Sequence, residues 1–135
     1  MSQYFEWNEK FDLEIPEMNH QHQKLIDLMN QLYELSSAKK ERSEIEAILD
    51  SLAQYTIKHF KEEEEFMKKI EFPQFEVHAI VHQNLLKTFQ EHIDSFKSGK
   101  DLDEKFFIFL KTWLYGHIQG VDVKYSQFHL KKPAA

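Results

Sequence analysis

IKHFKEEEEFMKKI (residues 57–70) is a helix-forming stretch in which His59 and Glu63 are four residues apart. Side chains at this spacing lie on one face of an α-helix. The same face continues on either side of the pair through Ile45, Ile48, Leu49, Leu52, Thr56, Met67 and Ile70. Since a buried carboxylate is costly unless it is paired, the stretch predicts a long amphipathic helix with a polar site facing the core.

The three other glutamates of the run have ordinary surface positions in this interpretation. Glu62 falls at the edge of the inward stripe, whereas Glu64 and Glu65 point outward, at about 100° of rotation per residue. We expect them to pair with lysines of the same helix, such as Lys61, Lys68 and Lys69. Only Glu63 is therefore a candidate for a binding role.

Similar apolar stripes predict three further helices. The predicted helices cover residues 16–36, 43–71, 75–98 and 102–118. Ser43, followed three residues later by Glu46, is a capping box that favours a helix start at residue 43. Because short connections join long amphipathic helices, we expect one all-α domain over residues 1–135, an antiparallel up-down-up-down four-helix bundle. An N-terminal extended segment (1–15) precedes the bundle, and an irregular or short helical part (119–135) follows it.

Polar residues occupy the inward stripe of every predicted helix. In chain order they are His22, His59, Glu63, His78, His82, His117 and Asp122. His78 and His82 are again four residues apart, so this pair can chelate one ion or two neighbouring ions. Imidazole and carboxylate without thiolate suit iron, zinc, copper or manganese. Seven donors exceed the coordination of one such ion, so the pattern predicts two ions that share bridging carboxylates. His20, His92 and His129 fall outside the pattern, and we expect no metal role for them.

The last two donors do not fit a regular helix. His117 and Asp122 are five residues apart, so an undistorted α-helix would point them about 140° away from each other. Both reach one centre only if the helix is distorted or ends between them. Gly116 and Gly120 favour such a distortion. We therefore predict irregular backbone between residues 117 and 122.

The composition excludes several other classes of site. The 135 residues include no cysteine, which rules out disulfides, thiolate metal sites and thiol nucleophiles. The net charge of −6 disfavours a surface for nucleic acid or anionic lipid. The first residues, MSQYFEWNEKF, lack the pattern of a signal peptide, and no stretch approaches the roughly 18 apolar residues of a membrane span. We expect a cytoplasmic protein without membrane insertion.

The donor motifs closely resemble those of the hemerythrin family, in particular its single-domain bacterial members. The matching stretches are HQHQKL, HFKEEEEFM, HAIVH and WLYGHIQGVDVKY, and WNEKFDLEIPEM (residues 7–18) resembles the segment before the first family helix. All seven donors match in order and spacing over nearly the whole chain. One departure is Asn19, where many relatives have aspartate, and it predicts a difference in the groups around the ligands rather than in the ligands.

The resemblance implies a non-heme di-iron centre with an oxo or hydroxo bridge. In such a centre His78, His82 and His117 would bind one iron, and His22 and His59 the other. Glu63 and Asp122 would bridge the two ions. Dioxygen would bind at the open position of the iron that has only two histidines. The positions that line the oxygen pocket in the family are Leu25, Phe60, Trp113, Leu114 and Ile118.

Reversible dioxygen binding, for carriage, storage or delivery to an oxygen-using enzyme, is the function that the resemblance implies. On this reading the chain is not an enzyme, apart from a weak peroxidase-like activity, and it is a monomer or weak homo-oligomer. One alternative is an oxygen or redox sensor that acts through a partner. Others are a di-iron enzyme of the peroxidase, nitric-oxide-scavenging or iron–sulfur-repair type, and a bundle in which zinc only holds the helices together.

Overall fold

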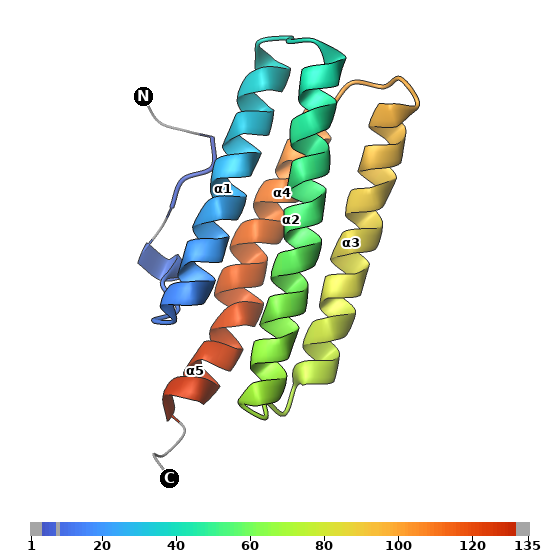
Figure 1. Ribbon diagram of the computed structural model, residues 1–135. Helices are drawn as coiled ribbons and strands as arrows, with labels where there is room; N and C mark the ends of the chain where they lie inside the picture. The colour runs from blue at the N-terminus through green and yellow to red at the C-terminus, as the bar shows by residue number, and fades with distance from the viewer. Residues whose placement is uncertain (1–3, 8, 132–135) are drawn as a thin grey trace.

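A computed structural model of the chain describes residues 4–7 and 9–131, and the predicted segments 1–15 and 119–135 extend beyond these limits. Its long helices are α1 (Pro16–Ser37), α2 (Arg42–Lys69), α3 (Phe75–Lys97) and α4 (Glu104–His117). They run alternately up and down and pack side by side in an antiparallel bundle (Figure 1). No strand occurs in the described part of the chain. The structure confirms the predicted four-helix bundle.

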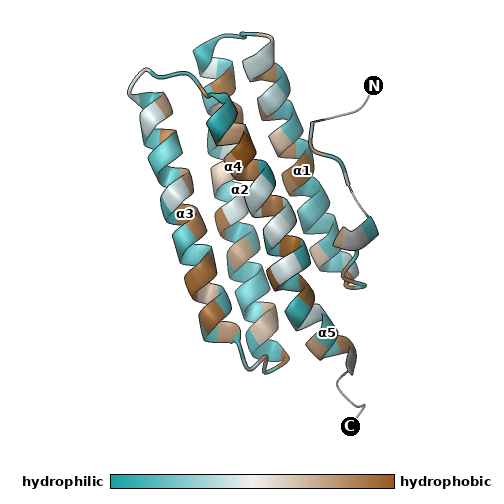
Figure 2. Ribbon diagram, turned by 180° about the vertical axis from the view of Figure 1, so that it is seen from behind, coloured by the Kyte–Doolittle hydropathy of each residue, from teal (hydrophilic) through white to brown (hydrophobic). Residues whose placement is uncertain are grey.

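Each helix of the bundle is amphipathic. Hydrophobic and hydrophilic residues alternate in bands along the helices (Figure 2). The apolar faces meet in one core, which includes Met29, Leu49, Phe89 and Leu110, all at most 2% exposed. Burial of such side chains stabilises a fold by about 1.5–3 kcal/mol each. The core therefore holds the four helices in the register that the site requires.

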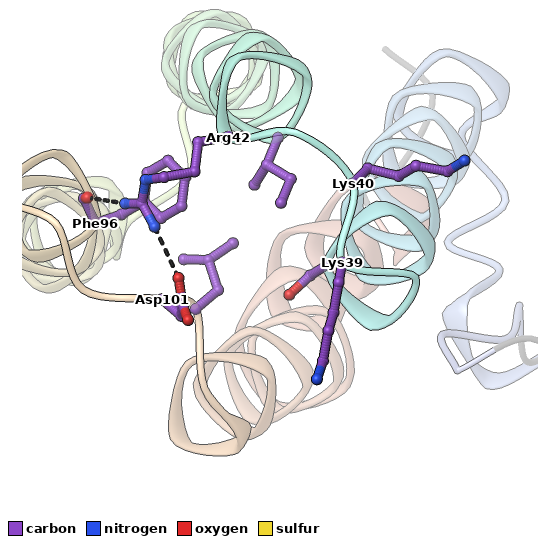
Figure 3. Close-up of a pocket in the computed structure, with 8 residues that line it drawn as sticks. Lys39, Lys40, Arg42, Phe96 and Asp101 are labelled. Atoms are coloured by element: carbon purple, nitrogen blue, oxygen red, sulfur yellow. Dashed lines mark hydrogen bonds and ion pairs between the residues drawn. The ribbon is translucent and has the colours of Figure 1, made fainter.

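The start of α2 differs from the prediction. The helix begins at Arg42, and its N-cap residue Glu41 makes no side-chain cap hydrogen bond, so the capping box predicted at Ser43 and Glu46 is wrong. Arg42 instead reaches across the end of the bundle. Its guanidinium donates to the backbone oxygens of Phe96 and Lys100 and pairs with Asp101 at 2.7 Å (Figure 3). The α1–α2 and α3–α4 connections are thereby joined.

The fourth helix continues past α4 with a change of winding. A π-helical turn, η2 (Ile118–Asp122), leads directly into α5 (Val123–Lys131), and the ribbon runs on as one bent helix (Figure 1). The irregular backbone predicted between residues 117 and 122 is this turn. Neither Gly116 nor Gly120 is needed for it, because neither has a positive φ and a Cβ added to either would meet nothing within 4 Å.

An N-terminal arm (residues 4–7 and 9–15), with a 3₁₀ turn at Glu9–Phe11, lies along α1 (Figure 1). The buried side chain of Asn30 accepts from the backbone nitrogen of Phe5 and donates to its backbone oxygen. The Oδ1 atom of Asn19 accepts from the backbone nitrogen of Leu13 at 2.9 Å. Asn19 therefore fastens the arm, through hydrogen bonds to Leu13 and Asp12.

Within residues 4–7 and 9–131, no helix is both long enough and apolar enough to cross a membrane.

Candidate metal centre

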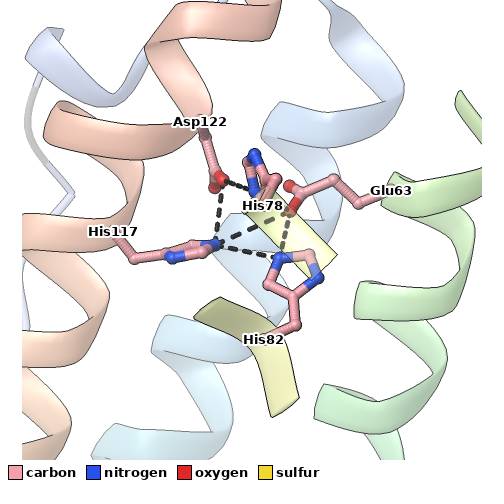
Figure 4. A group of neighbouring side chains, drawn as sticks. All are labelled: Glu63, His78, His82, His117 and Asp122. Carbon is pink, nitrogen blue, oxygen red and sulfur yellow. Dashed lines mark hydrogen bonds and ion pairs between the residues drawn. The ribbon is translucent and has the colours of Figure 1, made fainter. Parts of the chain in front are cut away.

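The seven donors predicted from the sequence converge inside the bundle. Five of them point toward one another from three different helices (Figure 4). All seven side chains are buried, with exposed fractions from 0% to 6%. Their ligand atoms form two overlapping groups in which all atoms lie within 4.8 Å of one another. One group is Glu63, His78, His82, His117 and Asp122, and the other is His22, His59, Glu63 and Asp122.

Glu63 belongs to both groups because its two oxygens face in different directions. Its Oε1 atom lies 2.8 Å from Nε2 of His82 and 3.2 Å from Nε2 of His78. Its Oε2 atom lies 3.4 Å from Nε2 of His59 and 3.6 Å from Nε2 of His22. A carboxylate in this orientation can bridge two ions, each bound by one set of histidines.

Asp122 is divided between the groups in the same way. Its Oδ1 atom lies 2.9 Å from Nε2 of His117 and 3.0 Å from Nε2 of His78, while Oδ2 lies 3.1 Å from Nε2 of His22. The π turn makes this possible, because its extra residue brings Asp122 back to the face of the helix that carries His117. Turns of this kind are frequent at functional sites.

Several of these buried atoms make no well-aligned hydrogen bond among the described residues, although the oxygens of Asp122 lie within ion-pair distance of histidine nitrogens. The atoms without such a bond are Nδ1 and Nε2 of His22, Nε2 of His59, Nδ1 of His117 and both carboxylate oxygens of Asp122. Leaving buried polar atoms unpaired is costly. Apart from the two Nδ1 atoms, they all face the space between the two groups. A set of imidazole nitrogens and carboxylate oxygens directed at one space fits first-row metal ions.

Despite burial, the carboxylates raise the pKa of His22, His78 and His117 when no metal is bound. Burial lowers the pKa of His22, but the Asp122 and Glu63 carboxylates outweigh it and raise the pKa to about 9. His117 has the same balance, and its pKa is raised to about 10. Burial raises the pKa of Glu63, yet the surrounding imidazoles hold it well below its usual value. Bound metal ions would displace the protons on these histidines and supply the positive charge that balances the carboxylates.

His59 differs from these three histidines. Burial lowers its pKa, so the ring is neutral at pH 7. Its Nδ1 atom lies 2.6 Å from Oε1 of Gln21 and donates to it. The Nε2 lone pair is then directed into the site, which is the form that binds a metal ion. The ring of His59 therefore has the protonation state and orientation of a metal ligand in the metal-free protein.

Sequence reasoning missed four residues around the donors. The hydroxyl of Tyr125 donates to Oε2 of Glu63 at 2.9 Å, and Gln21 links His59 to Glu62. Oε2 of Glu64 lies 3.0 Å from Nδ1 of His82. The outward orientation predicted for Glu64 is therefore wrong, whereas Glu62 lies at the edge of the inward stripe as predicted and accepts a hydrogen bond from Gln21. A signal for Tyr125 exists, because it follows Asp122 by three residues and so lies near the same helix face.

The five residues predicted to line an oxygen pocket surround one small cavity. Leu25, Phe60, Trp113, Leu114 and Ile118 line it together with His22, His59 and His117. Its volume is about 10 Å³, which is at the lower limit for one water molecule. The cavity therefore lies against both groups of donors, and its other walls are apolar.

The other three histidines lie outside the site. His20 and His129 are exposed, and His92 is half-buried and stacks on Phe109 at a ring distance of 5.0 Å. None of the three belongs to a possible metal-binding group within the described residues. The seven donors of the sequence pattern are thus the residues that the fold brings together.

Comparisons with known proteins agree with this geometry. The family model for the hemerythrin HHE cation binding domain matches residues 13–126. A bacteriohemerythrin of Stenotrophomonas maltophilia is 28% identical over 89% of this chain and 78% of its own length. One from Methylococcus capsulatus is 33% identical over 78% of this chain and 81% of its own. The crystal structure of a wild-type hemerythrin superimposes with a TM-score of 0.85 and 29% identity, covering 92% of this chain and 96% of that one.

Proposed function

Because this chain belongs to the hemerythrin family, we propose that its seven converging side chains hold two iron ions and that it binds dioxygen reversibly. The chain would serve in oxygen carriage, storage or delivery. The buried donors whose atoms make no well-aligned hydrogen bond in the described part of the chain support the metal assignment. Iron rather than another first-row metal follows from the family.

The two groups of donors differ in the number of histidines. His78, His82 and His117 would hold one iron, and His22 and His59 the other, with Glu63 and Asp122 shared. The ion with fewer protein ligands would keep a position for an external molecule. Two ferrous ions would supply the two electrons that dioxygen takes up on binding and returns on release.

The single observation that carries the proposal is the cavity beside His22 and His59. Its remaining walls, apart from His117, are the apolar side chains of Leu25, Phe60, Trp113, Leu114 and Ile118. A dry shell controls solvent access to a metal site, so it favours retention of a bound gas molecule over its loss as a hydrated anion. The cavity volume of about 10 Å³ suits a very small ligand such as a gas molecule better than an organic substrate.

The proposal is tested by loading the protein with ferrous iron under anaerobic conditions. The visible spectrum is recorded after exposure to oxygen and again after the oxygen is removed. We expect a charge-transfer band that appears with oxygen and disappears without it, at a stoichiometry of two irons per chain. Rapid oxidation that does not reverse would favour the sensor or enzyme alternatives. Failure to bind two irons would contradict the di-iron centre itself.

A further inference from the structure

Two metal-facing histidines on different sides of the site have unequal partners behind them. Nδ1 of His82 lies 3.0 Å from a carboxylate oxygen of Glu64. Nδ1 of His59 lies 2.6 Å from the amide oxygen of Gln21, whose Nε2 atom donates to Glu62 at 2.8 Å. A negative charge thus contacts His82 directly, whereas a neutral amide stands between His59 and its carboxylate.

The position of the ring proton follows from the other nitrogen. Nε2 of His82 faces Glu63 at 2.8 Å, and Nε2 of His59 faces the same carboxylate at 3.4 Å. A ring that gives its Nε2 lone pair to a metal ion carries its proton on Nδ1. In the metal-bound protein, each Nδ1–H therefore donates outward, to Glu64 in one case and to Gln21 in the other.

The ring of His82 is also held in place on its face. Phe60 stacks on it with a centroid distance of 3.8 Å and an interplanar angle of 3°. Glu64 is half-buried, with 29% of its side chain exposed, so its charge is only partly screened by solvent. The stacked ring and the hydrogen bond together fix the direction of Nε2.

Carboxylates behind a ligating histidine orient the ring and make its metal-bound nitrogen a stronger donor. We propose that Glu64 is a positioning residue that makes the His82 side of the centre the more electron-rich one, and that Gln21 keeps the charge of Glu62 one residue away from His59. The inference rests on the proposed di-iron function. It adds that the two metal positions are made unequal by groups outside the ligand set.

Replacing Glu64 with glutamine isolates the charge, because the amide oxygen still accepts from Nδ1 of His82. We expect Glu64→Gln to bind cobalt(II) about tenfold more weakly than the unchanged protein, at the lower end of such effects. Glu65→Gln is the matched control, since Glu65 is the next residue and is exposed. A cobalt(II) affinity of Glu64→Gln equal to that of Glu65→Gln would overturn the proposal.

A charge exchange tests the other side of the centre. The double variant Gln21→Glu/Glu62→Gln keeps the net charge and allows a hydrogen bond between the two positions in the reverse direction, from the amide now at position 62 to the carboxylate now at position 21, but moves the carboxylate into contact with His59. We expect tighter cobalt(II) binding than in the unchanged protein. An unchanged or lower cobalt(II) affinity, in a variant that keeps the helical content of the unchanged protein, would contradict the role given to Gln21.

The reduction potential of the iron-loaded protein separates tuning from a merely structural effect. A nearby negative charge stabilises the ferric state, so Glu64→Gln should raise the potential and the double variant should lower it. Reduction potentials of the two variants that do not shift in these directions would contradict the proposal. Cobalt(II) affinities do not depend on dioxygen, so they remain a test even if the protein fails to bind oxygen reversibly.

Discussion

Glu63 contacts both halves of the metal centre through its two oxygens, and it also accepts from Tyr125. We therefore expect Glu63→Ala to lose the second metal ion and to weaken binding of the first, because a shared ligand disappears from each. Glu65→Ala should leave the metal content unchanged, since Glu65 is exposed. Metal analysis of the two purified variants measures the difference. Equal metal content in both variants would contradict the bridging role.

Tyr125 is fully buried, and its hydroxyl donates a hydrogen bond to the Glu63 carboxylate at 2.9 Å. A hydrogen bond to a charged group contributes about 1.5–3 kcal/mol to stability. We expect Tyr125→Phe to destabilise the metal-free protein by about this amount, as measured by urea unfolding. A change in unfolding free energy near zero would show that Glu63 finds another donor in the variant.

The ligands of the site could be predicted from the sequence, whereas the groups behind them could not. Helical spacing alone places His59 with Glu63 and His78 with His82 on inward faces. The contact between Glu64 and His82, by contrast, depends on how closely α2 and α3 approach each other. Helical spacing predicts an exposed side chain for a residue next to an inward-facing one, such as Glu64 after Glu63. A long side chain at such a position can nevertheless bend toward the neighbouring helix.

At the scale of the elements, Arg42 connects the start of α2 to the end of α3. Its guanidinium donates to the backbone oxygens of Phe96, in the last turn of α3, and Lys100, just after α3. It also lies 4.1 Å from the ring centre of Phe96. We expect Arg42→Ala to destabilise the bundle by about 1–3 kcal/mol, because acceptors at the end of α3 lose their donor.

Asp101→Asn provides the control for this prediction. Asp101 pairs with Arg42, but its side chain is 93% exposed. Exposed ion pairs contribute little to stability, so we expect almost no change in the urea midpoint of Asp101→Asn. A loss as large as that of Arg42→Ala would show that the ion pair, rather than the backbone contacts, joins the two connections.

The helix limits near this connection show why local sequence signals are incomplete. Ser43 and Glu46 form a capping pattern, yet α2 starts one residue earlier, at Arg42. The arginine gains its contacts from a segment more than fifty residues away in the chain. The N-cap of α4, Asp103, has a local partner, because its side chain accepts from the nitrogen of Phe106 in the first turn at 3.0 Å. Caps with local partners are predictable, and those with distant partners are not.

At the scale of the whole molecule, protons and metal ions compete for one buried centre. Carboxylates of the site overcome burial and raise the pKa of His22 from 6.5 to about 9 and that of His117 to about 10. Metal binding must displace these protons. We therefore expect proton release on cobalt(II) binding and an affinity that rises with pH until the pH exceeds the two pKa values of about 9 and about 10. Calorimetry in buffers of different ionisation enthalpy measures both quantities.

The same two histidines set the stability of the metal-free bundle in alkali. Because their folded-state pKa values are raised, their contribution is fully present below pH 6.5 and is lost as the pH rises through about 9 and about 10. The melting temperature of the metal-free protein should fall over this range, and that of the metal-loaded protein should fall less. Parallel curves for the two forms would contradict the assignment of these protons to the metal site.

The π turn makes the chain one residue longer at this point than a regular helix would need. Deleting Gly120, which is exposed, would leave His117 and the aspartate four residues apart, and this spacing keeps both on one face of an ordinary α-helix. Inserting an alanine after Gly120 would instead leave the two residues six apart, which puts them about 120° from each other on an ordinary α-helix. The molecule should therefore tolerate shortening here better than lengthening. Metal content of the two variants would reveal this asymmetry, and equal losses would exclude it.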